Sequence, residues 1–396
     1  MDGVVSGEVA VACPACGEPA GEGARFCESC GAALGAAQGG PVDASAAAAP
    51  AADAAAAAAP QAAQAAPGPV ACPACGGEVA DDGYCTQCGA RAPVERDHRE
   101  ESAAPHVAGV TDVGARRRRN EDAMALGVAG DVSVLVVCDG VSSAPDSDVA
   151  SQAAATAARD VLVAGAGSVA ADDAGAWSRL LVTAGDRADA AAHAAVDDAA
   201  ARQDPPSCTF AAAVVTPALL VAGWLGDSRV YWLPDAGTPE QLTEDDSVAA
   251  ELMAGGMSRA AAERSPDAHA ITRWLGADAE DTTARTVATH LTGAGWVLAC
   301  SDGLWNYASA PEVVADLLRD ATARVGADPA ALSRDLVAWA NAAGGHDNVT
   351  VALARVPAPV AAGADPDTLA ADPGTTPTVR RRPAGSLPEK PGSPTP

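Results

Sequence analysis

Four short acidic motifs lie in order along otherwise apolar stretches of the chain, and they restrict its fold more than any other feature. They are Asn120-Glu121-Asp122, Cys138-Asp139-Gly140, Ser301-Asp302-Gly303 and Asp347-Asn348. A single Asp-Gly pair is typical of a turn. However, the second and third motifs follow the strand-like runs 132–137 and 296–300, where burying a carboxylate is costly unless a partner neutralises it. Hard divalent cations are suitable partners, so the ordered set predicts a metal centre.

The motifs and their spacing resemble the metal-dependent protein phosphatase 2C family over roughly residues 105–356. Further matching segments are Gly114 with the arginines 116–119, Gly226-Asp227-Ser228-Arg229, Asp245-Asp246-Ser247, Ile271-Thr272-Arg273-Trp274-Leu275-Gly276, Leu304-Trp305 and Gly344-Gly345-His346. The resemblance implies a serine/threonine protein phosphatase. Such an enzyme hydrolyses phosphomonoesters with a water activated between two Mn²⁺ or Mg²⁺ ions.

The resemblance also implies which residues hold the two ions. Asp139 would bridge them, and the Gly140 carbonyl would ligate one of them. Asp302 and Asp347 would complete the other. These three aspartates are therefore the expected catalytic carboxylates.

Four further residues are expected near the ions by the same resemblance. Glu121 would hold a metal-bound water, with Asp122 and Asn348 behind it. Asp227 would help to hold a third, weaker ion, or its turn would be purely structural. The sequence leaves these two roles of Asp227 open.

An arginine is expected to bind the substrate phosphate, because a planar guanidinium matches its oxygens in pairs. The run Arg116–Arg119 offers four candidates, and the family spacing favours Arg117. The other three would form a basic surface patch. No histidine follows Asp139-Gly140, where some relatives carry the general acid, so the resemblance leaves metal-bound water as the alternative source of the proton for the leaving group. His346 is tempting as an acid but is expected to be structural, and His193 is expected to lie on a helix surface.

Eight of the eleven cysteines lie before residue 90 in two matched sets. Each set is Cys-x-x-Cys, a gap of ten or nine residues, and Cys-x-x-Cys-Gly. Four thiolates held by two knuckles suit a tetrahedral Zn²⁺, so each set resembles a zinc ribbon. Disulfides are the alternative, but no secretory signal precedes the sets. The expected ligands are Cys13, Cys16, Cys27, Cys30, Cys72, Cys75, Cys85 and Cys88.

The other three thiols, Cys138, Cys208 and Cys300, lie in apolar runs and are expected to be packed in the core. A catalytic thiolate of the tyrosine-phosphatase kind is the alternative. It would need an arginine a few residues after the cysteine, at the end of a phosphate-binding loop. The segment 139–144 has none.

Composition shifts suggest the domain organisation. The expected parts are zinc ribbon 1 (1–32), an Ala- and Pro-rich linker (33–70), zinc ribbon 2 (71–92), a solvated hinge (93–104), the phosphatase-like domain (105–357) and a disordered tail (358–396). The segment 245–276 resembles the flap that lies beside the active site in the family.

The expected fold class is α+β. Strand-like runs occupy 106–112, 132–138, 208–215, 219–225, 286–290, 296–299 and 349–356, and helical stretches occupy 145–164, 176–202 and 327–343. Consecutive strand pairs with intervening helices favour antiparallel sheets. This agrees with the family's four-layer sandwich of two antiparallel sheets flanked by helices.

Net charge bears on the partners. The chain carries a formal charge of −27, and residues 1–100 contain 13 Asp or Glu against 4 Arg. Nucleic acid and anionic membranes would repel most of such a chain. The ribbons are therefore expected to bind protein, and the expected location is cytoplasmic. A phosphorylated protein, such as a serine/threonine kinase or its target, is the expected substrate.

Three function classes remain after the sequence alone. The first is an active metal-dependent phosphatase with accessory ribbons. The second is an inactive phosphatase-like scaffold, against which the presence of Asp139, Asp302 and Asp347 together counts. The third is a nucleic-acid or protein-binding factor led by its zinc ribbons.

Overall fold

The computed structural model describes residues 11–12, 19–20, 71–72, 74–80, 83–141, 146–196 and 205–358. The first cysteine set, the linker 33–70 and residues 359–396 of the tail lie outside the described residues. The short strands β1 (Val11–Ala12) and β2 (Pro19–Ala20) pair with each other. All other elements lie between residues 95 and 356.

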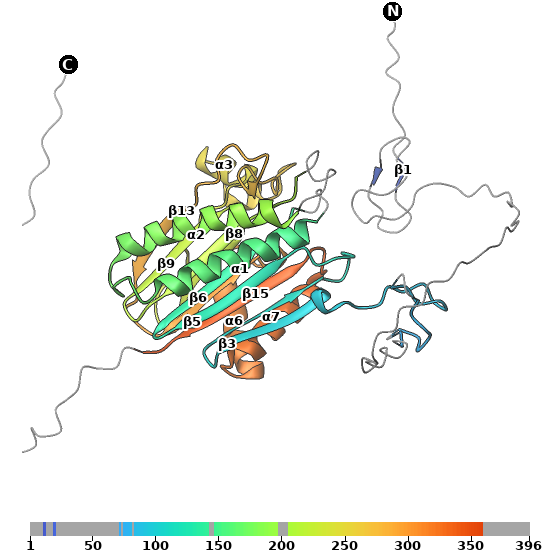
Figure 1. The fold of residues 1–396 in the computed structure, drawn as a ribbon, viewed down its shortest axis with the longest axis horizontal. Coiled ribbons are helices and arrows are strands. Elements are labelled where there is room, and N and C mark those ends of the chain that lie inside the picture. Colours follow the sequence, from blue (N-terminus) through green and yellow to red (C-terminus); the bar gives the residue numbers. More distant parts are fainter. Residues whose placement is uncertain are drawn as a thin grey trace, which may run out of the picture. The chain divides into compact units, whose positions relative to one another are not determined.

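Two antiparallel sheets form the centre of this region (Figure 1). The larger has the order β11 (Glu240–Gln241), β10 (Arg229–Pro234), β14 (Gly295–Cys300), β15 (Val349–Val356), β4 (Val107–Asp112), β3 (His98–Ala104). The smaller has the order β13 (Arg285–His290), β9 (Leu219–Leu225), β8 (Phe210–Val215), β6 (Val132–Cys138), β5 (Ala123–Ala129). A separate pair joins β7 (Ser207–Cys208) to β12 (Leu275–Gly276).

Helices cover the outer face of each sheet. The smaller sheet packs against α1 (Ser147–Gly165) and α2 (Ala174–Ala195), and the larger against α6 (Pro311–Val325) and α7 (Pro329–Ala343). A third core lies between the two sheets. The predicted four-layer sandwich of antiparallel sheets flanked by helices is therefore confirmed.

Strand β6 shows why these strands are continuous apolar runs in the sequence. Val134 and Val136 pack toward α1 and α2, whereas Leu135 and Val137 pack toward the larger sheet. Successive side chains of a strand point to opposite faces. Because both faces of this sheet are covered, every position of the strand is buried. The chain first meets a polar requirement at Asp139, where the strand ends.

Small side chains allow α1 to lie close to the smaller sheet. Ala150, Ala154 and Ala158 are fully buried in that contact. At Gly127 of β5, an added Cβ would stand 2.5 Å from Cγ2 of Val163 on α1. The core has few aromatic side chains to fill its volume. Alanine and glycine compensate, because they let the helix and the sheet pack closely together.

The structure differs from the expected hinge at 93–104. Residues Glu95–Asp97 form the 3-10 helix η1, and His98–Ala104 form β3, the edge strand that pairs with β4. Its side chains are exposed or half-buried. Charged residues are usual on an edge strand, where they discourage pairing with other chains. The charged residues 95–101 therefore belong to η1 and to an edge strand, and the expectation of a solvated hinge was wrong.

The termini of several expected elements also shifted. The expected strand 208–215 is interrupted at Thr209, which separates β7 from β8. The short helices α3 (Val248–Ala254) and α4 (Arg259–Ala262) lie in the flap segment 245–276.

Cys138, Cys208 and Cys300 are all fully buried, as expected for packing residues. In the described part of the chain, no helix has the length and apolar character needed to cross a membrane.

Candidate active site

Strand ends and turns from both sheets meet at a cavity of about 200 Å³. Asp139 follows β6, and Asp302 begins the short helix α5 (Asp302–Trp305) just after β14. Asp347 precedes β15, and Asp227 lies in the turn between β9 and β10. The cavity thus brings together four of the predicted carboxylates. Its other lining residues are Arg117, Gly140, Val141, Thr209, His269 and Ile271.

Two glycines allow the motif loops to approach one another. A Cβ added at Gly303 would stand 2.0 Å from the carbonyl oxygen of Asn348. At Gly114, where φ is +79°, it would stand 2.1 Å from that of Asp347. No side chain fits at either position, so these glycines are required for the motifs to converge.

The cavity is electrostatically unfavourable for its own carboxylates. Burial, followed by repulsion from neighbouring carboxylates, raises the pKa of Asp139 and of Asp302 well above the usual range. Burial raises the pKa of Asp227 to about 7, with a further contribution from Asp245. Groups of like charge that are buried together need protons or a cation to be stable.

The unpaired oxygens of the cavity fit a divalent cation. Oδ2 of Asp302 accepts a hydrogen bond of 3.0 Å from Asn306 Nδ2. Its Oδ1 is buried and has no hydrogen-bond partner among the described residues. A buried carboxylate oxygen without a donor is costly. Oxygen ligands from several carboxylates are the donor set of Mg²⁺ and Mn²⁺ sites, so the residues present suit the ions that the sequence predicted.

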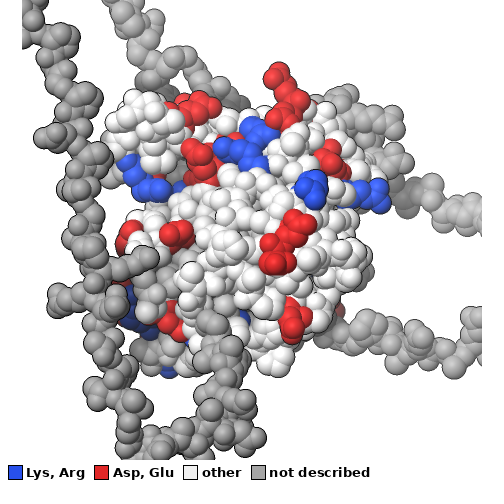
Figure 2. Space-filling model, turned by 90° about the vertical axis from the view of Figure 1, so that its left-hand side faces the viewer, with Lys and Arg blue, Asp and Glu red and all other residues white. Residues whose placement is uncertain are grey.

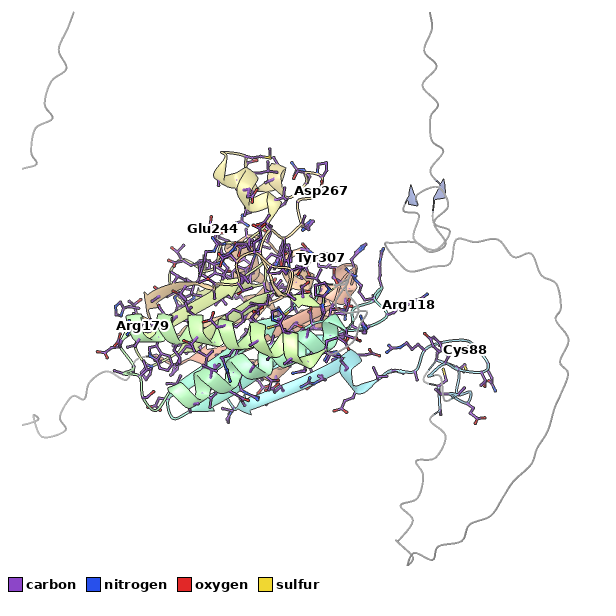
Figure 3. The ribbon with its side chains drawn as sticks, turned by 45° about the horizontal axis from the view of Figure 1, so that its top comes forward. Cys88, Arg118, Arg179, Glu244, Asp267 and Tyr307 are labelled. Carbon is purple, nitrogen blue, oxygen red and sulfur yellow. The ribbon has the colours of Figure 1, made fainter. Side chains whose placement is uncertain are left out.

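Of the four consecutive arginines, the fold brings only Arg117 into the cavity lining. Its Nη2 lies 2.6 Å from Oδ2 of Asp347. Burial opposes the charge of Arg117, but Asp347 outweighs that effect and its pKa is raised. Arg116 and Arg118 are exposed (Arg118 is labelled in Figure 3). Arg119 instead pairs with Glu121 at 2.7 Å.

Glu121 lies beside the cavity but is not part of its lining. Its Oε1 accepts hydrogen bonds from Arg119 and from Ser147 Oγ, the latter at 2.7 Å. An added Cβ at Gly140 would meet the Glu121 carbonyl oxygen at 2.6 Å, so the two motifs are in direct backbone contact. Glu121 is therefore adjacent to the expected metal position but is held by α1 and by the arginine loop.

Asn348 and Asp122 form the polar support behind the cavity. Oδ1 of Asn348 accepts from the Glu121 N–H at 2.8 Å, and its Nδ2 donates to the carbonyls of Val113 and Arg119, each at 2.9 Å. The Asn348 side chain thus fixes both ends of the loop 113–119, which carries the four arginines.

Asp122 is buried and is bonded to residues that follow or belong to two strands of the larger sheet. Its Oδ2 accepts from Ser301 Oγ at 2.6 Å and from Thr350 Oγ1 at 2.8 Å. Burial nevertheless raises its pKa to about 6. Asp122 thus joins β5 to β14 and β15 directly behind the cavity.

The turn that carries Asp227 is tied to a buried ion pair. The Arg229 side chain is 1% exposed and its Nη2 lies 2.6 Å from Oδ2 of Asp245. Its guanidinium carbon lies 3.7 Å from the centre of the Trp305 ring. Trp305 in turn donates from Nε1 to the Asp227 carbonyl at 2.9 Å. The turn therefore has a structural role, and the Asp227 carboxylate still faces the cavity.

Sequence reasoning missed two polar residues of the cavity. Thr209 Oγ1 accepts from the Asp139 N–H at 2.9 Å, and its own N–H donates to the Asp139 carbonyl at 2.8 Å. His269 comes from the flap, which was expected beside the site without this histidine being singled out. His346 is exposed and outside the lining, and its N–H donates to Tyr307 Oη. His193 is exposed on α2.

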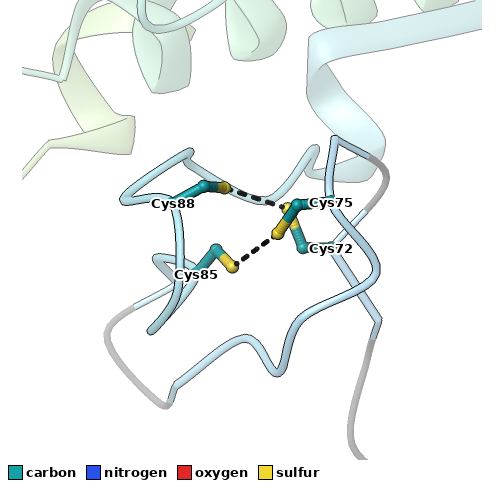
Figure 4. Close-up of side chains that lie close together, drawn as sticks. All are labelled: Cys72, Cys75, Cys85 and Cys88. Atoms are coloured by element: carbon teal, nitrogen blue, oxygen red, sulfur yellow. Dashed lines mark hydrogen bonds between the residues drawn. The ribbon is translucent and has the colours of Figure 1, made fainter.

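The second cysteine set forms a compact group of thiols (Figure 4). The four Sγ atoms of Cys72, Cys75, Cys85 and Cys88 all lie within 4.8 Å of one another. Cys72 and Cys88 are 3.7 Å apart, and Cys75 and Cys85 are 3.4 Å apart. Zn–S bonds of about 2.3 Å give tetrahedron edges of roughly 3.8 Å, so the thiols have the spacing of a zinc site.

Comparisons with known proteins agree with both parts of the chain. A family model described as protein phosphatase 2C matches residues 114–340, and one described as double zinc ribbon matches residues 13–89. The serine/threonine phosphatase stp of Listeria monocytogenes is 29% identical to this chain over 247 residues, which are 61% of this chain and 92% of that protein.

Two solved structures share the fold. A bacterial serine phosphatase is 23% identical, with a TM-score of 0.52, over 64% of this chain and 98% of its own. Serine/threonine phosphatase Stp1 from Staphylococcus aureus is 23% identical, with a TM-score of 0.51, over 66% of this chain and 99% of its own. The protein phosphatase 2C family model matches more than half of the residues of this chain, so the chain belongs to the protein phosphatase 2C family.

Proposed function

We propose that this chain is a metal-dependent phosphatase that hydrolyses phosphoserine and phosphothreonine in proteins. The observation that carries this function is the cavity in which Asp139, Asp227, Asp302 and Asp347 lie together with Arg117. Carboxylates that repel one another provide sites for cations, and a guanidinium beside them provides a site for an anionic phosphoryl group.

Two Mn²⁺ or Mg²⁺ ions are assigned to these carboxylates. Asp139 would bridge them with help from the Gly140 carbonyl, and Asp302 and Asp347 would hold one of them. When bound, such ions supply an activated water and neutralise charge on the phosphoryl oxygens. Thr209 would fix the backbone of Asp139 in this arrangement, because it bonds to both the N–H and the carbonyl of that residue.

Two further carboxylates complete the assignment. Glu121 would orient water at the edge of the site from its place beside Gly140. Asp227 would hold a third ion, and its buried carboxylate with a pKa raised to about 7 supports this assignment. Asp122 and Asn348 would keep these groups in place through the support described above.

Arg117 is assigned to the substrate phosphate. It is the one arginine of the run 116–119 in the cavity lining, and its side chain remains 33% exposed, so a substrate can reach it. A bidentate guanidinium would orient the phosphoryl group for attack by water. The neighbouring Arg116 and Arg118 would add to the positive charge at the rim.

A protein substrate is favoured by the surroundings of the cavity. His269 and Ile271 of the flap form one of its walls. A separate cavity of about 360 Å³ is lined in part by flap residues, among them Asp245, Met253 and Arg259. These surfaces offer both polar and apolar contacts to a peptide that carries the phosphorylated residue. A serine/threonine kinase or its target remains the proposed partner, and the cytoplasm the proposed location.

The ribbons are proposed to hold one structural Zn²⁺ each and to bind protein. Residues 1–100, which include both cysteine sets, carry 13 Asp or Glu against 4 Arg. On the face of the phosphatase-like domain that Figure 2 shows, acidic and basic side chains are also interspersed with uncharged surface. Neither distribution offers the continuous basic surface that binds a nucleic-acid backbone.

The function is tested by assaying the full, zinc-loaded protein on a phosphothreonine peptide and on p-nitrophenyl phosphate. We expect turnover that requires Mn²⁺ and that falls by several orders of magnitude in Asp139→Asn. A folded, Mn²⁺-supplied protein that turns over neither substrate would be a phosphatase-like scaffold instead. Turnover of nucleotides or sugar phosphates but of no phosphoprotein would move the substrate to a small metabolite.

A further inference from the structure

One histidine reaches the candidate active site from outside all the acidic motifs. His269 lies in the flap, and its side chain is among those that line the cavity with Asp139, Asp302 and Arg117. Figure 3 labels Asp267, two residues earlier, on the flap, and Glu244, which directly precedes it. No other histidine lines the cavity in the described part of the chain.

The backbone around His269 is anchored on both sides. The carbonyl of Ala268 accepts from the Ala249 N–H at 3.1 Å, and that of Ala270 accepts from the Val248 N–H at 3.0 Å. Both donors belong to the first turn of α3. Ala268 is also only 3% exposed. The position of His269 is therefore fixed by the flap's own secondary structure and is not that of a loose loop tip.

Trp305 provides a platform for the imidazole. The ring centroids of His269 and Trp305 are 5.9 Å apart, with an angle of 32° between the planes. The Trp305 side chain is buried, packs against Arg229 and donates to the Asp227 carbonyl. His269 is exposed to solvent, and this aromatic contact places its imidazole beside a buried ring whose Nε1 donates to the turn that carries Asp227.

Hydrolysis of a serine or threonine phosphate leaves an alkoxide, which needs a proton. Imidazole is the side-chain type best suited to deliver one near neutral pH. The cavity's carboxylates are assigned to cations, and Arg117 does not release a proton in proteins. The Thr209 hydroxyl is engaged with Ser228 Oγ at 2.7 Å and with the Asp139 N–H.

We propose that His269 is the general acid of the reaction and protonates the departing serine or threonine oxygen. This inference rests on the proposed phosphatase function. The charged groups that line the same cavity as the imidazole are the carboxylates of Asp139, Asp227, Asp302 and Asp347 and the guanidinium of Arg117, and Arg229 lies on the Trp305 ring.

The step is balanced without any further reactant. The oxygen of a water molecule forms a bond to phosphorus, and the bond between phosphorus and the serine or threonine oxygen breaks. The electron pair of that bond stays on the leaving oxygen, which takes a proton from the imidazolium to give the free hydroxyl. The attacking water releases one proton to solvent, and the imidazole takes one up before the next turnover.

The test compares leaving groups of different basicity in the full, zinc-loaded protein with Mn²⁺. p-Nitrophenolate leaves readily without a proton, whereas phenolate and the alkoxide of phosphothreonine do not. The variants are His269→Gln and His269→Ala. The matched control is His290→Gln, because His290 is an exposed histidine on β13 that contributes nothing to the cavity.

We expect His269→Gln to lower kcat for the phosphothreonine peptide and phenyl phosphate by about 10²- to 10⁴-fold, the usual contribution of a general acid. The same variant should change kcat for p-nitrophenyl phosphate less than about tenfold, and KM little for any substrate. Added imidazole should restore part of the peptide activity of His269→Ala. His290→Gln should behave as the wild type.

Equal losses on all three substrates, or a rise in KM alone, would overturn the proposal in favour of a role for His269 in flap position or phosphate binding. Unchanged peptide turnover would overturn it as well. Retained hydrolysis of p-nitrophenyl phosphate shows that each variant is folded and metal-loaded. A wild type that turns over none of the substrates would instead contradict the proposed function.

Discussion

At the scale of single residues, Arg117 is the arginine that the family spacing favours and the one of the run 116–119 that lines the cavity. We predict that Arg117→Ala lowers kcat/KM for a phosphothreonine peptide by on the order of 10- to 100-fold, because about 1.5–3 kcal/mol of charge-assisted hydrogen bonding to the phosphate is lost. Steady-state kinetics measures this loss. Arg116→Ala is the matched control, since Arg116 is exposed and outside the cavity, and an equal effect in both would contradict the assignment.

Asp227 gives a prediction about pH. Its pKa is raised from 3.8 to about 7, chiefly by burial. Between these values the folded protein holds a proton that the unfolded chain releases. The stability contributed by this group is therefore complete below about pH 4 and is lost as the pH rises through 7, with an upper limit on the order of 4 kcal/mol.

Thermal unfolding of zinc-loaded protein freed of Mn²⁺ and Mg²⁺ measures this effect. Asp227→Asn has no carboxyl group to titrate at this position. Its melting temperature should therefore rise relative to that of the wild type as the pH rises from 4 to 8. Added Mn²⁺ should reduce the gain by stabilising the wild-type carboxylate. A difference between the two proteins that stays constant over this range would contradict the prediction.

Single residues were also where sequence reasoning had its limits. Four residues predicted from the sequence line the cavity, namely Asp139, Asp302, Asp347 and Arg117. They could be predicted because each belongs to a motif with its own local signal. His269 has no such signal, since an isolated histidine in a flap is placed only by the packing of α3 and Trp305. Thr209 likewise acts through a contact between strands that no sequence pattern reveals.

At the scale of elements, η1 is hydrogen-bonded to the acidic motif Asn120-Glu121-Asp122 through Arg96. Arg96 Nε donates to the Asn120 carbonyl at 2.8 Å, and Asn120 Nδ2 donates back to the Arg96 carbonyl at 3.1 Å. We predict that Arg96→Ala lowers the free energy of unfolding by about 1–3 kcal/mol, because it leaves partly buried carbonyl groups without a donor. Denaturant unfolding measures this, with Arg179→Ala on the exposed face of α2 as the control. An equal loss in both would show that the contact is dispensable.

The elements predicted best were those buried on both faces. Strands such as β6 and β14 are uninterrupted apolar runs, so periodicity and length identify them. By contrast, β5 consists largely of small residues, β10 begins with the buried Arg229, and β3 carries the charges of an edge strand. Each departs from the usual strand composition for a reason that lies in tertiary packing.

At the scale of the whole molecule, two kinds of metal site are expected to be independent. We assign Zn²⁺ to the thiolates of the ribbons and Mn²⁺ or Mg²⁺ to the carboxylates, because soft thiolates suit Zn²⁺ and carboxylates suit Mg²⁺ and Mn²⁺. We predict that Cys85→Ser removes one equivalent of Zn²⁺ from the protein and leaves the Mn²⁺-dependent hydrolysis of p-nitrophenyl phosphate within about threefold of the wild type, since Zn²⁺ folding of a ribbon is local.

Native mass spectrometry gives the zinc content of this variant. Cys300→Ala is the control, because Cys300 is buried in β14 and belongs to neither cysteine set. The zinc content of Cys300→Ala should match that of the wild type. Full zinc content in Cys85→Ser would contradict the assignment of the second ribbon.

The most direct test of the account is a titration of Mn²⁺ into the zinc-loaded protein, followed by calorimetry or by the paramagnetic resonance of free Mn²⁺. The convergence of Asp139, Asp302 and Asp347 on one cavity predicts two tightly bound equivalents at the active site, beside the weaker third ion assigned to Asp227. Asp139→Asn should weaken the two tight equivalents together, because Asp139 is assigned to bridge them. Two equivalents that persist unchanged in Asp139→Asn, or no binding to a folded wild type, would contradict the metal centre on which the proposed function depends.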